Sequence, residues 1–134
     1  LDVRAGYNKA AAAAPPVKAV NGVGEAWTRA MFLGIADTNP YDGIEFGKVS
    51  LWSWDYYHAS TYGYYLQALV VFGNLTGVDP RSLGKNECSG FELGMSQHEV
   101  NMLQQAAFEQ LVSENKVTAA PLIISSSVYP SHCT

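Results

Sequence analysis

Hydrophobic residues recur with the spacing of an α-helix in three stretches of the chain, residues 25–37, 61–74 and 96–114. In the first stretch the apolar residues are Ala26, Trp27, Ala30, Met31 and Leu33. In the second stretch the apolar stripe consists of Tyr62, Tyr65, Leu66, Leu69, Val70 and Gly73. In the third stretch the apolar face consists of Val100, Leu103, Ala107 and Leu111. The pattern therefore predicts three helices, each with one face against a core.

Local signals indicate where the second and third of these helices begin and end. Ser60 can accept a hydrogen bond from the first turn of the second helix, and Gly77 is a typical residue to end it. Ser96 and Glu99 have the spacing of a capping box at the start of the third helix. Between these two helices, residues 77–94 are rich in glycine, so we expect a loop there.

Two short segments between the helical stretches favour extended structure. An alanine-rich helix at the beginning of the chain is expected to stop at Pro15 and Pro16. Residues 17–23 are then apolar and β-prone with two glycines, which predicts a strand that enters a tight turn. Residues 38–43 combine Asn-Pro with Asp-Gly and predict a turn. Residues 48–52 predict either a second short strand or an extended lead-in.

This order of elements predicts an α/β fold, namely part of a helix-and-sheet sandwich. A lone strand at residues 17–23 cannot bury both of its faces, because buried parallel strands need neighbours on both sides. We therefore expect a missing N-terminal segment to complete the sheet. Residues 1–134 would then be a single domain or the C-terminal half of one.

The composition narrows the function classes. The chain is 48% hydrophobic and only 15% charged, as expected of a folded protein. Its net charge is −4 and its Lys and Arg residues are scattered, so binding to nucleic acid or to an anionic membrane surface through a basic face is not expected. No apolar run reaches the roughly 18 residues that a membrane-spanning helix needs.

The two cysteines, Cys88 and Cys133, both lie in polar, turn-rich sequence. A disulfide between them would tie the C-terminal tail to the rest of the chain and would indicate a secreted or periplasmic protein. Two unpaired surface thiols remain the alternative. Asn74-Leu75-Thr76 also fits the acceptor pattern for N-glycosylation, a pattern that arises often by chance.

The most conspicuous polar pair is Asp55 and His58, three residues apart within a run of aromatic residues. A carboxylate that accepts from one imidazole nitrogen fixes the tautomer and leaves the other nitrogen free as a general base. The alternative is structural, with Asp55 capping the helix that follows. The aromatic neighbours Trp52, Trp54 and Tyr56 either pack in the core or form the wall of a substrate site. No spacing typical of zinc ligands is present, so no metal site is expected.

Several separated motifs around this pair resemble the C-terminal block of SGNH hydrolases, the GDSL-type esterases and lipases. They are VGEAW at 23–27, LW at 51–52, DYYHAS at 55–60, GYYLQA at 63–68 and LTG at 75–77. The resemblance covers residues 17–80, and several motifs in one order are more specific than a lone D-x-x-H. The chain looks most similar to an uncharacterised branch of that family. The resemblance implies a flavodoxin-like fold, a three-layer α/β/α sandwich with a parallel sheet.

The resemblance implies a Ser-His-Asp triad in which His58 is the general base and Asp55 orients it, with no metal or organic cofactor. It also implies a nucleophilic serine in a Gly-Asp-Ser block, but the chain has no such block, and the serines at 125–127 lack the flanking residues. We therefore expect a second polypeptide from the same precursor to supply the serine and the oxyanion hole. Alone the chain would be inactive; the substrate would be a small ester or an acylated carbohydrate. The alternative is a non-catalytic binding or assembly module with a degenerate SGNH fold.

Overall fold

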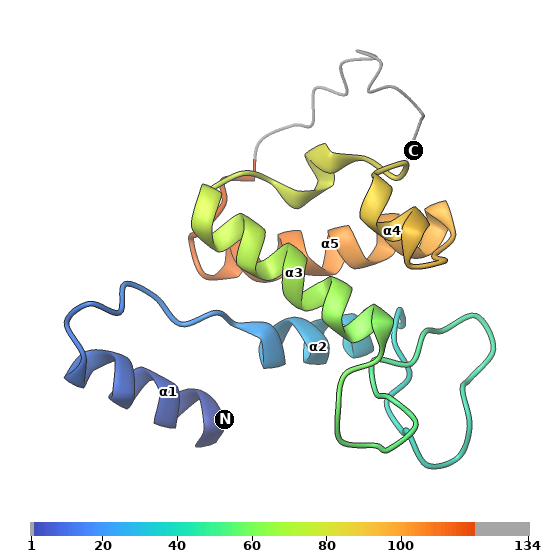
Figure 1. The fold of residues 1–134 in the computed structure, drawn as a ribbon, viewed down its shortest axis with the longest axis horizontal. Coiled ribbons are helices and arrows are strands. Elements are labelled where there is room, and N and C mark those ends of the chain that lie inside the picture. Colours follow the sequence, from blue (N-terminus) through green and yellow to red (C-terminus); the bar gives the residue numbers. More distant parts are fainter. Residues whose placement is uncertain (1, 120–134) are drawn as a thin grey trace.

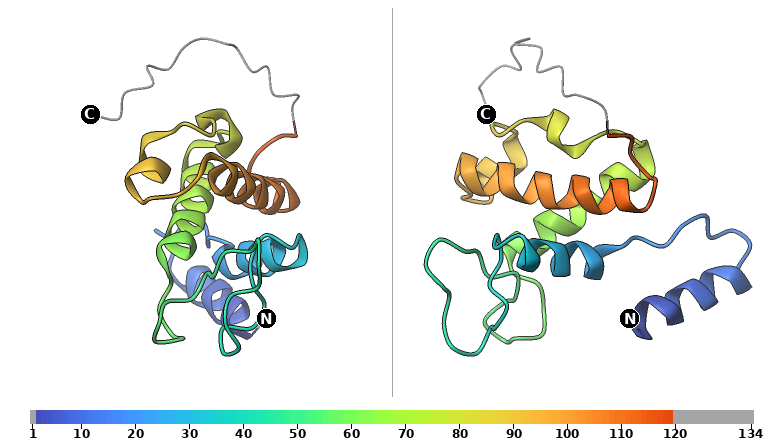
Figure 2. Two further views of the ribbon diagram at one scale, coloured as in Figure 1. Left: turned by 90° about the vertical axis from the view of Figure 1, so that its right-hand side faces the viewer. Right: turned by 180° about the vertical axis from the view of Figure 1, so that it is seen from behind.

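The computed structural model describes residues 2–119, and these residues form helices joined by loops (Figures 1 and 2). In chain order the elements are α1 Asp2–Ala13, α2 Val23–Phe32, α3 Thr61–Thr76, the short 3-10 helix η1 Pro80–Leu83, α4 Cys88–Glu92 and α5 Gln97–Ser113. In Figure 1, α3 crosses in front of α5 and α2, and the long loop that joins α2 to α3 extends from one end of the bundle. This loop carries Asp55 and His58.

The predicted parallel sheet, and with it the three-layer α/β/α sandwich, is wrong for the part of the chain that the structure describes. Residues 2–119 contain no strand. Residues 17–22 are irregular and mostly exposed, because no neighbouring strand offers their backbone a ladder of hydrogen bonds. Val23, expected to end a strand, begins α2 instead. The β-prone residues of this segment are therefore not enough to make a strand.

The second predicted strand, residues 48–52, is reduced to two isolated bridges. Val49 forms a parallel bridge with Ala36, and Trp52 forms an antiparallel bridge with Ala59. Val49 and Leu51 are buried, so their side chains do contribute to the core. The partner segments turn away after one residue, and neither bridge extends into a ladder. Residues 48–52 are therefore an extended lead-in that lines the core, and they do not form a strand.

The two helices with clear end signals are confirmed. Ser60 caps α3 by accepting a hydrogen bond from the Gly63 N–H at 3.2 Å, and Gly77 ends α3 with φ 70°. The capping box of α5 is present: Ser96 accepts from the Glu99 N–H at 3.2 Å, and the Ser96 N–H donates to the Glu99 carboxylate at 2.7 Å. Residues 77–94, expected to be a loop throughout, contain η1 and α4.

The helix predicted at residues 25–37 exists as α2 but ends at Phe32. Gly34 adopts φ 72°, a backbone conformation that glycine accepts without strain, and this turns the chain out of the helix. Ile35 and Ala36 then enter the core from an extended segment, and the Ile35 carbonyl accepts a hydrogen bond from the Val49 N–H. Asp37 follows at the start of the long loop.

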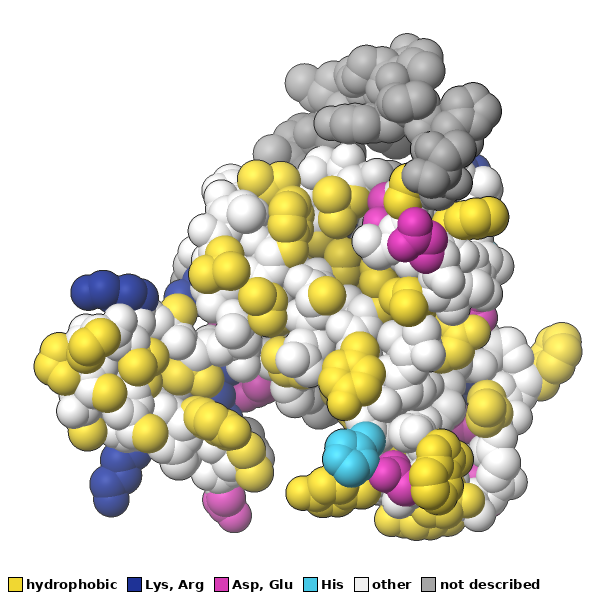
Figure 3. Space-filling model, viewed as in Figure 1, with side chains coloured by type: hydrophobic (Ala, Val, Ile, Leu, Met, Phe, Trp, Pro, Cys, Tyr) yellow, Lys and Arg dark blue, Asp and Glu magenta, His cyan; other side chains and the backbone are white. Residues whose placement is uncertain are grey.

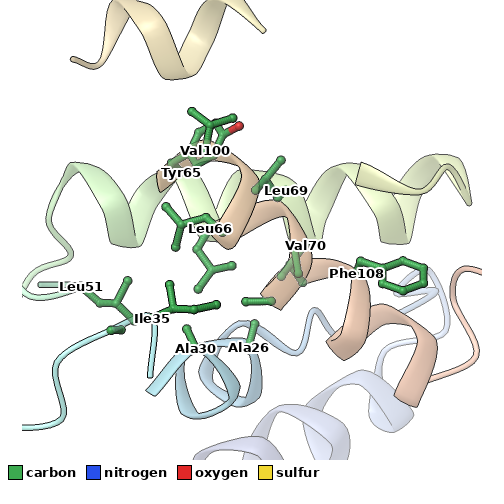
Figure 4. Close-up of a cluster of buried hydrophobic side chains, with 14 of the residues drawn as sticks. Ala26, Ala30, Ile35, Leu51, Tyr65, Leu66, Leu69, Val70, Val100 and Phe108 are labelled. Atoms are coloured by element: carbon green, nitrogen blue, oxygen red, sulfur yellow. The ribbon is translucent and has the colours of Figure 1, made fainter. Parts of the chain in front are cut away.

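One contiguous core forms where α2, α3 and α5 meet (Figure 4). The predicted apolar stripes point into it, as Figure 4 shows for Leu66, Leu69 and Val70 of α3. The small residues Ala26 and Ala30 of α2 are completely buried against them, which lets α2 approach closely. Trp27 and Met31, also on α2, pack at the edge of this cluster.

The alanine-rich first helix is confirmed as α1, which ends at Ala13 just before the two prolines. It has no buried residue and lies beside the bundle in Figures 1 and 2. Arg4 ties it to the bundle through ion pairs with Glu25 at 3.4 Å and Glu114 at 3.1 Å. The groove between α1 and α2, of about 1330 Å³, contains no residue of the loop that carries Asp55 and His58.

Candidate active site

The Asp55–His58 pair lies in a tight loop, residues 52–59, that we call the dyad loop. The bridge between Trp52 and Ala59 closes the loop, and the Ser53 N–H donates to the His58 carbonyl at 2.8 Å. Tyr56 turns the chain with φ 57°, an uncommon conformation for a residue with a side chain. Both ends of the loop are held at the core, and this fixes the position of the dyad.

Asp55 and His58 make the contact that their spacing predicts. The His58 Nδ1 atom lies 2.6 Å from the Asp55 Oδ2 atom, a short distance typical of a charge-assisted hydrogen bond. The other carboxylate oxygen, Oδ1, accepts from the backbone N–H groups of Tyr57 at 3.1 Å and His58 at 3.0 Å. Both oxygens are therefore occupied, and the carboxylate has a fixed orientation.

These hydrogen bonds keep Asp55 ionised. The His58 side chain, together with the backbone N–H groups of His58 and Tyr57, lowers the pKa of the Asp55 carboxyl to about 2. An ionised carboxylate only accepts hydrogen bonds, so Nδ1 must carry a proton and Nε2 is the basic nitrogen of neutral His58. Among residues 2–119, none hydrogen-bonds to Nε2, and 63% of the His58 side chain is exposed. The geometry is that of a general base with an oriented ring.

The capping interpretation of Asp55 does not fit this geometry. The cap of α3 is Ser60, which also donates to the Ser50 carbonyl at 2.6 Å. Asp55 lies five residues before Ser60 and its hydrogen bonds stay within the dyad loop. Asp55 thus orders this loop and orients His58, while the start of the helix is stabilised by another residue.

Exposed aromatic side chains surround the dyad. Trp54 is 88% exposed, Tyr57 78% and Tyr56 50%. The Tyr57 ring meets the His58 ring edge to face at 5.0 Å, and the Tyr56 ring packs on Tyr41 from the preceding turn at 5.0 Å. In Figure 3, hydrophobic side chains gather around a histidine and an acidic group at the lower edge of this face. Large apolar groups at this density on a surface are typical of binding sites.

A cavity of about 640 Å³ borders the dyad loop, and we call it the aromatic cavity. Its lining consists of Ile44, Ser50, Trp52, Ser53, Trp54, Ala59, Ser60, Thr61, Tyr62, Tyr64, Tyr65, Ala68, Ser89 and Leu93. Of the three aromatic residues predicted from the sequence, Trp52 and Trp54 line the cavity and Tyr56 does not. Trp52 is fixed by an edge-to-face contact with Trp27 at 4.7 Å.

Sequence reasoning missed Tyr64 as part of the cavity and assigned Tyr62 only to the apolar stripe. Both lie in the first turn of α3, directly after the dyad loop. A signal was present for Tyr64, because it falls outside the predicted apolar stripe and is nevertheless a large aromatic residue, 53% exposed. Tyr62 donates from its hydroxyl to the Glu99 carboxylate at 2.9 Å, which links the cavity wall to the start of α5.

The remaining candidates do not join the dyad. Within residues 2–119 no group of His, Cys, Asp and Glu side chains could hold a metal ion, and no helix is long and apolar enough to cross a membrane. Cys133 lies outside the described residues, so its pairing with Cys88 stays a prediction. Asn74, the glycosylation candidate, donates from its side chain to Asn21 at 2.6 Å. Its modification also stays a prediction.

The chain matches no protein-family model, no curated protein and no solved structure. The case for a function therefore rests on the geometry and chemistry of the dyad loop and on the sequence motifs around it.

Proposed function

We propose that the chain supplies the acid–base half of a serine ester hydrolase, with His58 as general base and Asp55 as its orienting carboxylate. The observation that carries the proposal is the 2.6 Å contact between His58 Nδ1 and Asp55 Oδ2, with Nε2 open to solvent. The motif order shared with SGNH hydrolases supports the same assignment of these two residues. The proposal does not depend on the sheet that sequence reasoning expected.

The chemistry needs a serine that the chain does not offer in a suitable motif, so a second polypeptide from the same precursor would supply it. The serine Oγ attacks the ester carbonyl carbon while His58 Nε2 accepts its proton, and N–H groups of the partner stabilise the oxyanion. The imidazolium then protonates the departing alcohol, which leaves an acyl-enzyme. Water hydrolyses the acyl-enzyme by the same proton path. Asp55 stays ionised throughout and stabilises the imidazolium.

The exposed apolar surface around the dyad supports a partner at this place. In addition to the dyad-loop aromatics, Tyr41, Ile44 and Phe46 in the preceding turn are 73%, 66% and 102% exposed. A partner that brings its serine to His58 would cover this surface and remove the apolar area from water. The proposal includes a secreted or periplasmic location, because the predicted disulfide would form in an oxidising compartment.

The test uses the native assembly, labelled with a fluorophosphonate probe that reacts with activated serines. We expect the label on a serine of the partner polypeptide, with hydrolysis of p-nitrophenyl acetate. In an assembly carrying His58→Ala, kcat should fall by about 10⁴-fold and labelling should be lost, while the urea midpoint of unfolding should change only slightly. The matched control is His98→Ala, which removes an exposed histidine of α5 and should leave kcat unchanged.

Two results would contradict the proposal. One is full activity of the His58→Ala assembly. The other is a native sample that contains only this 14.5 kDa chain, folded and monomeric, without labelled serine. The second result would favour the other candidate, a non-catalytic binding module, for which the aromatic cavity and its exposed rim are the supporting observation.

A further inference from the structure

We infer that the aromatic cavity binds an uncharged apolar group, an aryl ring or a short acyl chain, and does not select sugars or anions. This inference rests on the proposed function, under which the bound group would be either the acyl part or the alcohol part of the ester. The binding itself depends only on the cavity, so it can be tested without catalysis.

The lining of the aromatic cavity is uncharged and rich in aromatic side chains. None of the residues that line the cavity carries a charge, and five of them are aromatic, namely Trp52, Trp54, Tyr62, Tyr64 and Tyr65. An anion would find no cation to pair with among these residues, so nothing would compensate for the loss of its hydration. The carboxylate of Glu99 directly behind Tyr62 would add repulsion. The cavity therefore disfavours a carboxylate or phosphate ligand.

Several hydroxyl groups of the lining already donate hydrogen bonds within the protein. The Ser60 hydroxyl donates to the Ser50 carbonyl at 2.6 Å, and the Ser50 hydroxyl donates to the Trp52 carbonyl at 3.0 Å. The Tyr62 hydroxyl donates to Glu99. Recognition of a sugar needs a set of free donors and acceptors that match its hydroxyl groups, and these three donors are not free. Apolar contact is what the cavity mainly offers.

Contacts within the protein hold the inner wall of the cavity in shape before any ligand arrives. Trp52 packs edge to face against Trp27. Because residue 63 is a glycine, α3 packs closely on the segment before the dyad loop, and a Cβ atom at this position would lie 2.4 Å from the Leu51 carbonyl oxygen. Tyr62 is fixed by its bond to Glu99. A preformed wall saves the entropy of ordering side chains on binding. The volume of about 640 Å³ lies in the range of small-molecule sites and accommodates a phenyl ester.

The cavity and the dyad share one loop, which gives the inference its functional meaning. Ser53 and Trp54, directly before Asp55, line the cavity, and so does Ala59, directly after His58. A group held in the cavity therefore lies next to the loop that presents His58. This arrangement makes the cavity a specificity site for one side of the ester bond.

The experiment uses the 134-residue chain and follows its three tryptophan indole N–H signals by 1H–15N NMR. We expect phenyl acetate to shift the Trp52 and Trp54 signals with saturation in the millimolar range. Benzoate and methyl β-glucoside should bind at least tenfold more weakly. Tyr64→Ala and Trp54→Ala should each weaken phenyl acetate binding at least fivefold, as measured from the indole N–H signals that remain in each variant. Both side chains are largely exposed, so the variants should fold.

The matched control is Phe32→Ala, which removes an exposed ring at the end of α2, outside the cavity, and should leave the affinity unchanged. Equal or tighter binding of benzoate or the glucoside would overturn the inference, as would unchanged affinity in both cavity variants. Failure of the proposed function gives a different result. Phenyl acetate would then bind with the expected selectivity, but the native assembly would show no labelled serine and no hydrolysis.

Discussion

Gly63→Ala tests how closely the start of α3 packs on the segment that leads into the dyad loop. A Cβ atom at this position would lie 2.4 Å from the Leu51 carbonyl oxygen, 2.6 Å from Trp27 Cζ2 and 3.1 Å from Ala59 Cβ. The first of these contacts is with backbone, which cannot rotate away. The same carbonyl of Leu51 also accepts a hydrogen bond from the Ser60 N–H at 2.8 Å. Relief of the clash must therefore move α3 or the loop.

The magnitude follows from two opposing effects. Overpacking of a well-packed site costs about 1–3 kcal/mol, and contact with backbone places this site near the upper end. Alanine is a better helix former than glycine by about 1 kcal/mol, which offsets part of the cost. We expect a net loss of about 2 kcal/mol in the free energy of unfolding. With a urea m-value of about 2 kcal/mol/M, the midpoint should fall by about 1 M.

Two other glycine substitutions calibrate this measurement. At Gly24 in α2 an added Cβ meets nothing within 4 Å, so Gly24→Ala should leave the urea midpoint unchanged or raise it. At Gly73 the obstacle is the flexible Leu111 side chain, which can shift, so Gly73→Ala should fall between the two. A Gly63→Ala variant as stable as Gly24→Ala would refute the close packing of α3 on the dyad loop.

The remaining predictions concern the dyad and the start of α5. The Asp55 carboxyl should titrate near pH 2 by 13C NMR, and His58→Ala should raise this pKa toward, but not to, its ordinary value, because two backbone N–H donors remain. The pKa of Asp55 is lower in the folded chain than in the unfolded chain, so the stabilisation from Asp55 is present at neutral pH and is lost as the pH falls from about 4 toward 2. An ordinary Asp55 pKa in the unsubstituted chain would contradict the hydrogen bond to His58. Ser96→Ala should lower the stability by about 1 kcal/mol in urea, since the Glu99 N–H loses its acceptor, and an unchanged midpoint would mean that the cap contributes nothing.

Much of the candidate site was accessible from the sequence because its key contact is local. Asp55 and His58 are three residues apart, and a tight loop is enough to bring their side chains together. Trp52 and Trp54 lie in the same segment, and both were identified. Tyr64 was missed, because its place in the cavity depends on the direction in which α3 leaves the loop. That direction is set by contacts of α3 with the rest of the core.

The same distinction between local and distant contacts explains which parts of the fold could be predicted from the sequence. The sequence by itself determined that α1, α2, α3 and α5 are helices, and it determined the caps and buried faces of α3 and α5, but it did not reveal the short η1 and α4. A long helix is predictable because it satisfies its own backbone hydrogen bonds within a few residues, as the capping box of Ser96 and Glu99 illustrates. The sequence did not determine whether residues 17–22 or 48–52 would be strands, since a strand needs a partner elsewhere in the chain. Only the tertiary structure decided that residues 48–52 line the core through two isolated bridges, and that this core fixes the base of the dyad loop.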